Sequence, residues 1–185
     1  MASSEHNLLQ AARHNAPDAW NTLLKRHQLP LYTYVAEFLR DRPAALDVVQ
    51  ETFAAAIRHI GGLRDDTRFV SWLFGIAHQK CIQHWRRVQR DEVVFESNAD
   101  EAFRDLADND SADPRAILLQ REQAEDFFSL VEKLPAVQRS TLLLHVLEDF
   151  SLEEIAGITA VPVGTVKSRL HHAKRALRKL VEAAP

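Results

Sequence analysis

The last stretch of the chain, residues 162–185, combines cationic, imidazole and hydroxyl side chains at helical spacing. It holds six Lys and Arg residues against one Glu. At about 100° per residue, one narrow apolar stripe takes in Val163, Val166, Leu170, Ala173, Leu177 and Leu180. The opposite face carries Gly164, Ser168, His171, His172, Arg175 and Lys179. Such a division lets one side anchor to the protein while the other donates hydrogen bonds into a DNA groove.

The residues before this helix predict the rest of a helix-turn-helix. Ser151 and Glu154 have the spacing of a capping box, in which each side chain satisfies a backbone amide of the other residue. We expect a first helix after Ser151, a break bracketed by Gly157 and Pro162, and a second helix from Val163. Periodicity alone is as typical of a terminal amphipathic helix with a solvated basic face. The capping box, break and basic helix together favour DNA binding.

A second helix with unusual chemistry is predicted from Phe69 to Arg90. One apolar stripe consists of Phe69, Leu73, Ile76 and Ala77, and a second, displaced by about 100°, of Val70, Phe74, Cys81 and Trp85. Between His78 and the end of this helix, no acid accompanies the cations Lys80, Arg86, Arg87 and Arg90. Rings beside cations suit single-stranded nucleic acid, because rings stack on bases while cations hold phosphates. The alternative, a core position, is favoured for Phe69, Trp72, Leu73 and Ile76.

His78, Cys81 and His84 lie three and six residues apart on one face of this helix, which raises the question of a metal site. The outer pair would be separated by about 9 Å along the axis. One ion with bonds of ~2.0–2.3 Å would struggle to reach both, and no fourth ligand is evident. We therefore predict no metal and no cofactor. With only 5 Gly and no phosphate-binding loop, nucleophile elbow or catalytic dyad, the sequence predicts no catalytic residue and disfavours an enzyme.

Composition describes an ordinary globular protein of one or two units, with 46% hydrophobic and 26% charged residues in 185. Cys81 is the single cysteine, so no internal disulfide can form. The N-terminal residues lack the apolar core of a signal peptide, and no apolar run approaches the ~20 residues of a membrane span. We expect a cytoplasmic protein without direct membrane insertion.

The net charge of −3 is unevenly distributed along the chain. Residues 1–90 carry +4, residues 91–114 carry −8, residues 115–161 carry −4 and the tail carries +5. The acidic stretch 91–114 lacks regular periodicity and predicts a flexible linker between helical domains at residues 1–90 and 115–185.

Helical spacing also dominates the remainder of residues 1–90, so the fold class is predicted to be all-α. In the segment from Ala44 to Ile60, the spacing turns four apolar residues inward, namely Val48, Val49, Phe53 and Ile57. The same spacing leaves Asp47, Gln50, Glu51 and Arg58 more exposed. Only Val93, Val94 and Phe95 hint at a strand, and they are too few to count.

Two blocks of this sequence resemble bacterial RNA polymerase sigma factors of the sigma-70 family, extracytoplasmic-function (ECF) subgroup. The first block is DVVQETF at 47–53, FVSWLFGIA at 69–77 and the pair Arg86-Arg87. The second is Leu134-Pro135, SLEEIA at 151–156 and PVGTVKSRL at 162–170. The likeness covers nearly all of the chain outside the linker. It implies a region-2-like helical bundle and a region-4-like helix-turn-helix.

The resemblance implies a dissociable polymerase subunit that directs core polymerase to promoters and assists melting. Contacts with the −35 element are implied for Thr165, Lys167, Ser168, Arg169, His171, His172, Lys174 and Arg175. Contacts with the −10 element are implied for Trp72, His78, Gln79, Lys80, Gln83, Arg86 and Arg87. Binding to the core polymerase clamp helices is implied for Asp47, Gln50, Glu51 and Phe53. The family also implies an anti-sigma factor as partner, often one tethered at the membrane.

The chain departs from the family pattern at Gln79 and Gln83, where Asn and Asp are common, and at the pair His171-His172. The longer Gln side chains would reshape a base pocket, and the imidazoles would make the −35 contact sensitive to pH. Three other interpretations remain. These are a conventional helix-turn-helix regulator with a sensing or dimerisation domain, a protein-binding adaptor that uses the apolar stripes, and a metal-dependent enzyme.

Overall fold

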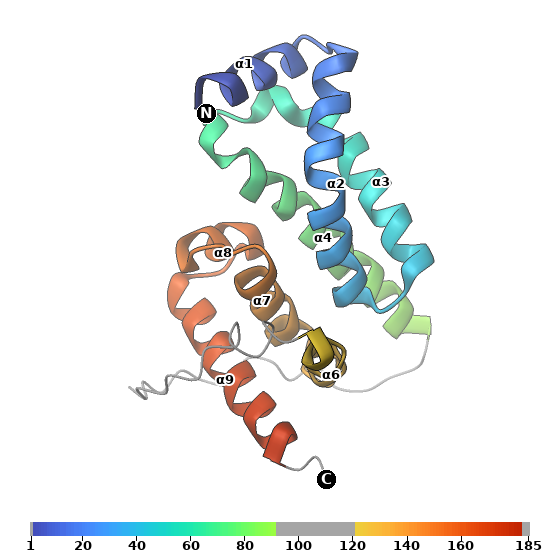
Figure 1. Cartoon of the computed structure of the whole chain (residues 1–185), viewed down its shortest axis with the longest axis vertical. Helices are drawn as coiled ribbons and strands as arrows, with labels where there is room; N and C mark the ends of the chain where they lie inside the picture. Colours follow the sequence, from blue (N-terminus) through green and yellow to red (C-terminus); the bar gives the residue numbers. More distant parts are fainter. Residues whose placement is uncertain (1, 92–120, 183–185) are drawn as a thin grey trace.

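The structure, a computed structural model, describes residues 2–91 and 121–182, and both ranges consist of helices joined by short turns (Figure 1). The prediction of an all-α fold is confirmed for the described residues. The predicted linker lies outside them except for Asp91, as do the three residues that hinted at a strand.

The first unit is built from long helices that cross one another (Figure 1). Its elements are α1 (Ala2–Arg13), α2 (Pro17–Leu39), α3 (Arg42–His59), the 3-10 turns η1 (Ile60–Gly62) and η2 (Asp66–Arg68), and α4 (Phe69–Asp91). Local chemistry sets several of their ends. Pro17 opens α2, where a missing amide proton costs nothing. Asp41 caps α3 by accepting a hydrogen bond from the Ala44 amide at 3.0 Å.

The second unit consists of shorter helices that lead into one long terminal helix. Its elements are α6 (Arg121–Glu132), α7 (Ala136–Leu147), α8 (Leu152–Thr159) and α9 (Val163–Glu182). The predicted capping box is present, because Ser151 accepts from the Glu154 amide while the Glu154 carboxylate accepts from the Ser151 amide at 2.9 Å. The predicted second helix starts at Val163, as expected.

The break between α8 and α9 differs from the prediction. Gly157 lies inside α8, and the helix continues to Thr159. The left-handed C-cap is Ala160, with φ of 55°, and its amide donates to the Ala156 carbonyl. Pro162 then prevents the helix from continuing. Glycine is the common residue at such a cap, and this chain places alanine there instead.

The two units are packed against each other rather than held apart. The rings of Phe74 in α4 and Phe150, just before α8, meet edge to face with centroids 5.1 Å apart. The Arg139 guanidinium of α7 lies 5.3 Å from the centroid of Phe38 in α2. At the edge, Arg40 Nε is 3.3 Å from a carboxylate oxygen of Glu132. Figure 1 shows α7 and α8 next to α4 and the lower part of α2.

Candidate nucleic-acid and polymerase interface

The basic face of α9 is available at the surface. The predicted apolar stripe anchors the helix, with Val166, Leu170, Ala173 and Leu177 buried. Among the predicted −35 residues, Lys167, His172 and Arg175 are exposed. The others are half-buried, namely Thr165, Ser168, Arg169, His171 and Lys174. The rings of His171 and His172 pack edge to face at 5.7 Å. This helix therefore presents donors on one side and is fixed to its own unit by the other.

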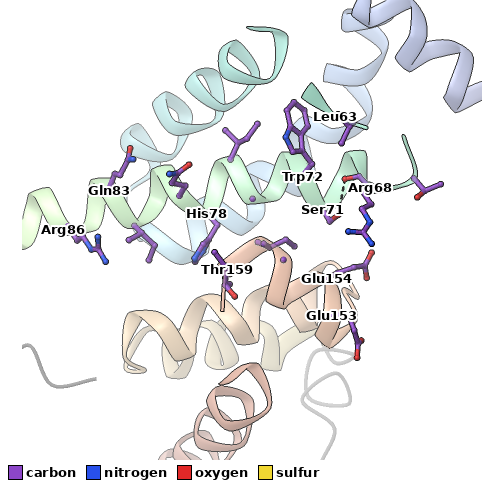
Figure 2. A pocket seen from close by; sticks show the side chains of 18 residues that line it. Leu63, Arg68, Ser71, Trp72, His78, Gln83, Arg86, Glu153, Glu154 and Thr159 are labelled. Atoms are coloured by element: carbon purple, nitrogen blue, oxygen red, sulfur yellow. Dashed lines mark hydrogen bonds between the residues drawn. The ribbon is translucent and has the colours of Figure 1, made fainter. Parts of the chain in front are cut away.

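The face of α4 that carries the predicted −10 residues borders a cavity of about 920 Å³ between α4 and α8. In Figure 2, His78 and Arg68 extend toward the second unit, whereas Trp72 and Gln83 point away from it. Gly75 lies where the helices approach, since a β-carbon there would be 3.9 Å from the Ile158 α-carbon. The second unit thus covers one flank of α4.

His78 differs from the other predicted −10 residues because its ring is engaged inside the protein. Its Nδ1 and the Tyr34 hydroxyl lie 2.9 Å apart. Burial, together with the charge of Arg169 from α9, lowers the pKa of His78 from 6.5 to about 4. The imidazole is therefore neutral at physiological pH. A predicted −35 residue thus lies close enough to a predicted −10 residue to alter its titration.

The remaining predicted −10 residues form a polar band along α4. Gln79, Gln83, Arg86 and Arg87 are exposed, and Trp72 is partly buried. Lys80 is half-buried, and its ammonium is 2.8 Å from a carboxylate oxygen of Glu51 in α3. Phe69 and Leu73 are buried, so the core interpretation is confirmed for these two residues. Trp72 and Ile76 are only partly buried against the core.

The three residues considered for a metal site differ in their contacts and burial. His78 pairs with Tyr34, and the Nδ1 atom of His84 lies 3.1 Å from an Arg87 nitrogen. Cys81 is fully buried, and burial raises the pKa of its thiol well above the usual range. Within the two described ranges, no group of three His, Cys, Asp or Glu residues is arranged to hold a metal ion.

On α3, the predicted polymerase-binding residues separate into two kinds. Asp47, Gln50 and Glu51 are exposed and share a surface. Phe53 is only 4% exposed and anchors α3 in the core, so its predicted contact with polymerase stays a prediction. Ile57, predicted to face inward, is 39% exposed, and Leu46 is 53% exposed. These two apolar side chains extend the α3 surface and were missed, because near-continuous apolar spacing does not show which flank faces solvent.

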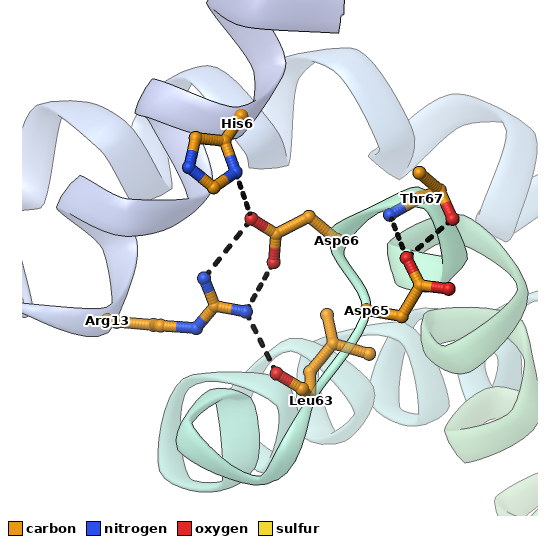
Figure 3. A network of polar contacts seen from close by, with 6 residues as sticks. All are labelled: His6, Arg13, Leu63, Asp65, Asp66 and Thr67. Atoms are coloured by element: carbon orange, nitrogen blue, oxygen red, sulfur yellow. Dashed lines mark hydrogen bonds and ion pairs between the residues drawn. The ribbon is translucent and has the colours of Figure 1, made fainter.

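Sequence reasoning also missed the loop that precedes α4 (Figure 3). Asp66 accepts hydrogen bonds from Arg13 of α1, and one of its oxygens is 2.7 Å from His6 Nδ1. Arg13 also donates to the Leu63 carbonyl at 2.9 Å, and its guanidinium lowers the pKa of Asp66. Leu63, Thr67 and Arg68 line the cavity beside α4. The helix α1 therefore fixes one wall of that cavity.

Among residues 2–91 and 121–182, no helix has both the length and the apolar content that crossing a bilayer requires.

Two family models match this chain. The model described as sigma-70 region 2 matches residues 23–91, which run from within α2 to the end of α4. The model described as sigma-70 region 4 matches residues 124–177, which include α7, α8 and most of α9. The match therefore places the α4 surface in one sigma region and the α9 surface in the other.

Relatives align over almost the whole chain. The chain is 30% identical over 182 residues to the RNA polymerase sigma-H factor of Pseudomonas aeruginosa, covering 96% of this chain and 94% of that protein. It is also 30% identical over 185 residues to the ECF RNA polymerase sigma-E factor of Escherichia coli K12, covering 95% and 93%.

Solved structures agree with the fold. CnrH in complex with the cytosolic domain of CnrY superimposes with a TM-score of 0.69 at 24% identity, covering 98% of this chain and 99% of that one. The sigma factor RpoE of Bartonella quintana, in complex with the anti-sigma factor NepR, gives a TM-score of 0.63 at 26% identity, covering 89% and 99%. Both sigma regions are present in order, and the relatives align over nearly the whole of both chains. This chain therefore belongs to the sigma-70 family, as an ECF RNA polymerase sigma factor.

Proposed function

We propose that the two helical units of this sigma factor divide promoter recognition, with α9 reading the −35 element and α4 engaging the −10 element. The exposed surface of α3 binds the clamp helices of core polymerase. The corresponding domains are residues 1–90 and 115–185, with 91–114 as the linker. The chain acts in the cytoplasm as a non-catalytic subunit, because its contribution is to position DNA and polymerase.

The single observation that carries this proposal is the two-sided character of α9. Val166 and Leu170 fix the helix to its unit, His172 and Arg175 are exposed on the opposite side, and Lys167 is exposed at its flank. Phosphate contacts from Lys and Arg set register and orientation, while side chains that reach base edges determine sequence preference. We assign Ser168, His171, His172 and Arg175 to base reading, and Lys167, Arg169 and Lys174 to phosphates.

On α4, the exposed polar band supports contact with the non-template strand of the −10 element. Gln79 and Gln83 supply both donors and acceptors, and Arg86 and Arg87 supply charge. Trp72 offers a partly accessible ring for stacking. His78 has a different role, since its pairing with Tyr34 makes it a support for the helix rather than a base contact.

An anti-sigma protein is the proposed regulator of this chain. The Bartonella quintana relative is described in complex with an anti-sigma factor. The side-by-side packing of the two units here gives such a protein a composite surface to bind, because helices from both units are adjacent. A partner that holds the units in this arrangement keeps α4 and α9 from spanning two promoter elements.

Run-off transcription with purified core polymerase and a promoter library tests the proposal. We expect sequence-dependent initiation that requires both this chain and core polymerase. Replacing Ser168, His171, His172 and Arg175 together by Ala should abolish selection at the −35 position while binding to core persists. A chain that forms a stable dimer and binds a palindromic operator without polymerase would instead be a conventional regulator.

A further inference from the structure

An ion pair connects the two surfaces that the proposed function assigns to different partners. Glu51 belongs to the polymerase-facing surface of α3, and Lys80 belongs to the DNA-facing band of α4. Their charged atoms, Lys80 Nζ and Glu51 Oε2, are 2.8 Å apart across the packed helices. While this pair exists, the Lys80 charge is neutralised by a carboxylate and is not directed at a phosphate.

The pair lies in a groove of about 500 Å³ whose two sides carry opposite charges. The α3 side presents the carboxylates of Asp41, Asp47 and Glu51. The α4 side presents Lys80, His84 and Arg87, together with Gln83. Lys80, Gln83 and Arg87 belong to the −10 band, so the groove borders that band, and Gln83 also lines the larger cavity between α4 and α8.

The two partners of the pair differ in accessibility. The side chain of Glu51 is 64% exposed, whereas that of Lys80 is 21% exposed. An approaching protein therefore reaches the carboxylate of Glu51 more easily than the ammonium of Lys80. Three carboxylates on one exposed helix side also specify the chemistry of that protein, because they favour a basic side chain.

Lys80 is the main partner of Glu51 but not a tightly held one. Its hydrogen bond is the largest cause of the lowered pKa of Glu51, and Arg87 and His84 contribute less. Exposed ion pairs are weak and exchange partners readily, since water and salt screen them. A competing cation can therefore displace Lys80 without unfolding either helix.

We propose that Glu51 is an exchange residue, which holds Lys80 in the free chain and releases it to a −10 phosphate when a basic side chain of core polymerase pairs with Glu51. This inference rests on the proposed function, because it takes α3 as the polymerase surface and α4 as the DNA surface. It gives core polymerase a direct means of adding one cation to the DNA-binding band.

The test compares how salt affects DNA binding by the full-length chain, alone and with saturating core polymerase. The probe is a fluorescein-labelled single-stranded DNA of mixed sequence, followed by anisotropy over a series of salt concentrations. Each Lys that newly contacts a single-strand phosphate steepens the plot of log affinity against log salt by about 0.7. The variants are Glu51→Gln, Lys80→Gln and the double variant, with Asp18→Asn as the control that removes one exposed carboxylate outside the groove.

In the free chain, Glu51→Gln should steepen the slope by about 0.7 and raise affinity about two- to fivefold. Asp18→Asn and Lys80→Gln should keep the wild-type slope, and the double variant should return to it. With core present, Lys80→Gln should lose about 0.7 of slope, and Glu51→Gln should match wild type.

Equal slopes for Glu51→Gln and Asp18→Asn in the free chain would overturn the exchange. A wild-type salt slope for Lys80→Gln in the presence of core polymerase would also overturn the exchange. The two proposals fail under different results. If the wild-type chain never initiates transcription with core polymerase, the proposed function is wrong. If the wild-type chain initiates normally but the variants do not change the salt slopes as expected, only the proposed exchange is wrong.

Discussion

The helices α4 and α9 both carry cations and polar side chains for DNA, yet they are held in opposite ways. Only one face of α9 is buried, in its own unit, and Lys167, His172 and Arg175 remain exposed. By contrast, α4 packs against its own bundle through Phe74 and Cys81 and is approached by α8 at Gly75. The α9 surface is therefore formed by one helix, whereas the α4 surface depends on its neighbours and on the placement of the second unit.

The largest expected effect comes from removing DNA contacts of α9, whose surface is formed by one helix. The double variant His172→Ala with Arg175→Ala should lower initiation at a selected promoter by roughly a hundredfold, because each base contact is worth about 1–3 kcal/mol. Core binding should persist, since neither side chain lies on α3. Run-off transcription and a core-binding assay give the two readouts. Lys25→Ala, which removes an exposed cation of α2, serves as the control and should stay near wild type.

The next test separates the two units. Phe150 is 6% exposed and packs on Phe74, so Phe150→Ala removes buried apolar surface and an aromatic contact. We expect at least a tenfold shift from closed to open molecules, given the usual cost of such a loss. Small-angle scattering should record a larger radius of gyration. Phe150→Leu, which keeps most of the volume, should remain closed, and equal radii for both variants would contradict the role of this contact.

An NMR titration of His78 reports locally whether the two units are packed together. Its pKa of about 4 reflects burial and the nearby Arg169 charge. Since the ordinary value is 6.5, stability linked to this residue is fully present above pH 6.5 and is lost as the pH falls through about 4. Opening the units with Phe150→Ala, or removing the charge with Arg169→Gln, should raise the pKa toward its ordinary value. No change in either variant would mean that α9 does not influence α4.

The smallest expected effect concerns Glu148, two residues before Phe150. Burial raises the pKa of this carboxyl from 4.5 to about 7. The charged form is therefore unfavourable in the folded protein, and the associated stability is present at low pH and is lost as the pH rises through about 7. Glu148→Gln should increase the free energy of unfolding at pH 8 by about 1 kcal/mol, allowing for solvent screening. Urea unfolding at pH 8 and pH 4.5 should show the gain in unfolding free energy only at pH 8. The exposed control, Glu153→Gln, should show no such gain at pH 8.

The contrast between α4 and α9 also explains what the sequence allowed us to predict. The all-α class, the range of α4, the capping box and the start of α9 all depend on local rules of periodicity and capping. The break at Gly157 was wrong because Ala160 takes the left-handed cap. No local rule favours alanine there, so this position depends on how α8 and α9 pack.

The buried and exposed sides of a helix were predictable where that helix alone forms the surface. The stripe of α9 is narrow, and its apolar and polar sides are confirmed by burial at Val166, Leu170 and Ala173. Around α4 the partners come from distant segments, as with Tyr34 against His78 and Glu51 against Lys80. Such pairings between segments far apart in the sequence have no signature in a single chain. The burial of Phe53 agrees with the spacing of α3, whereas the exposure of Ile57 depends on which flank of α3 faces the bundle.

Cys81 gives the α4 region a built-in probe. It is the single cysteine of the chain, it is 0% exposed, and burial raises the pKa of its thiol. A thiol reagent can modify it only when the surrounding helices transiently come apart. The modification rate of the unaltered protein therefore measures how often the first helical bundle opens. The same measurement with core polymerase or an inhibitor bound would report how strongly each partner stiffens that bundle, without any introduced label.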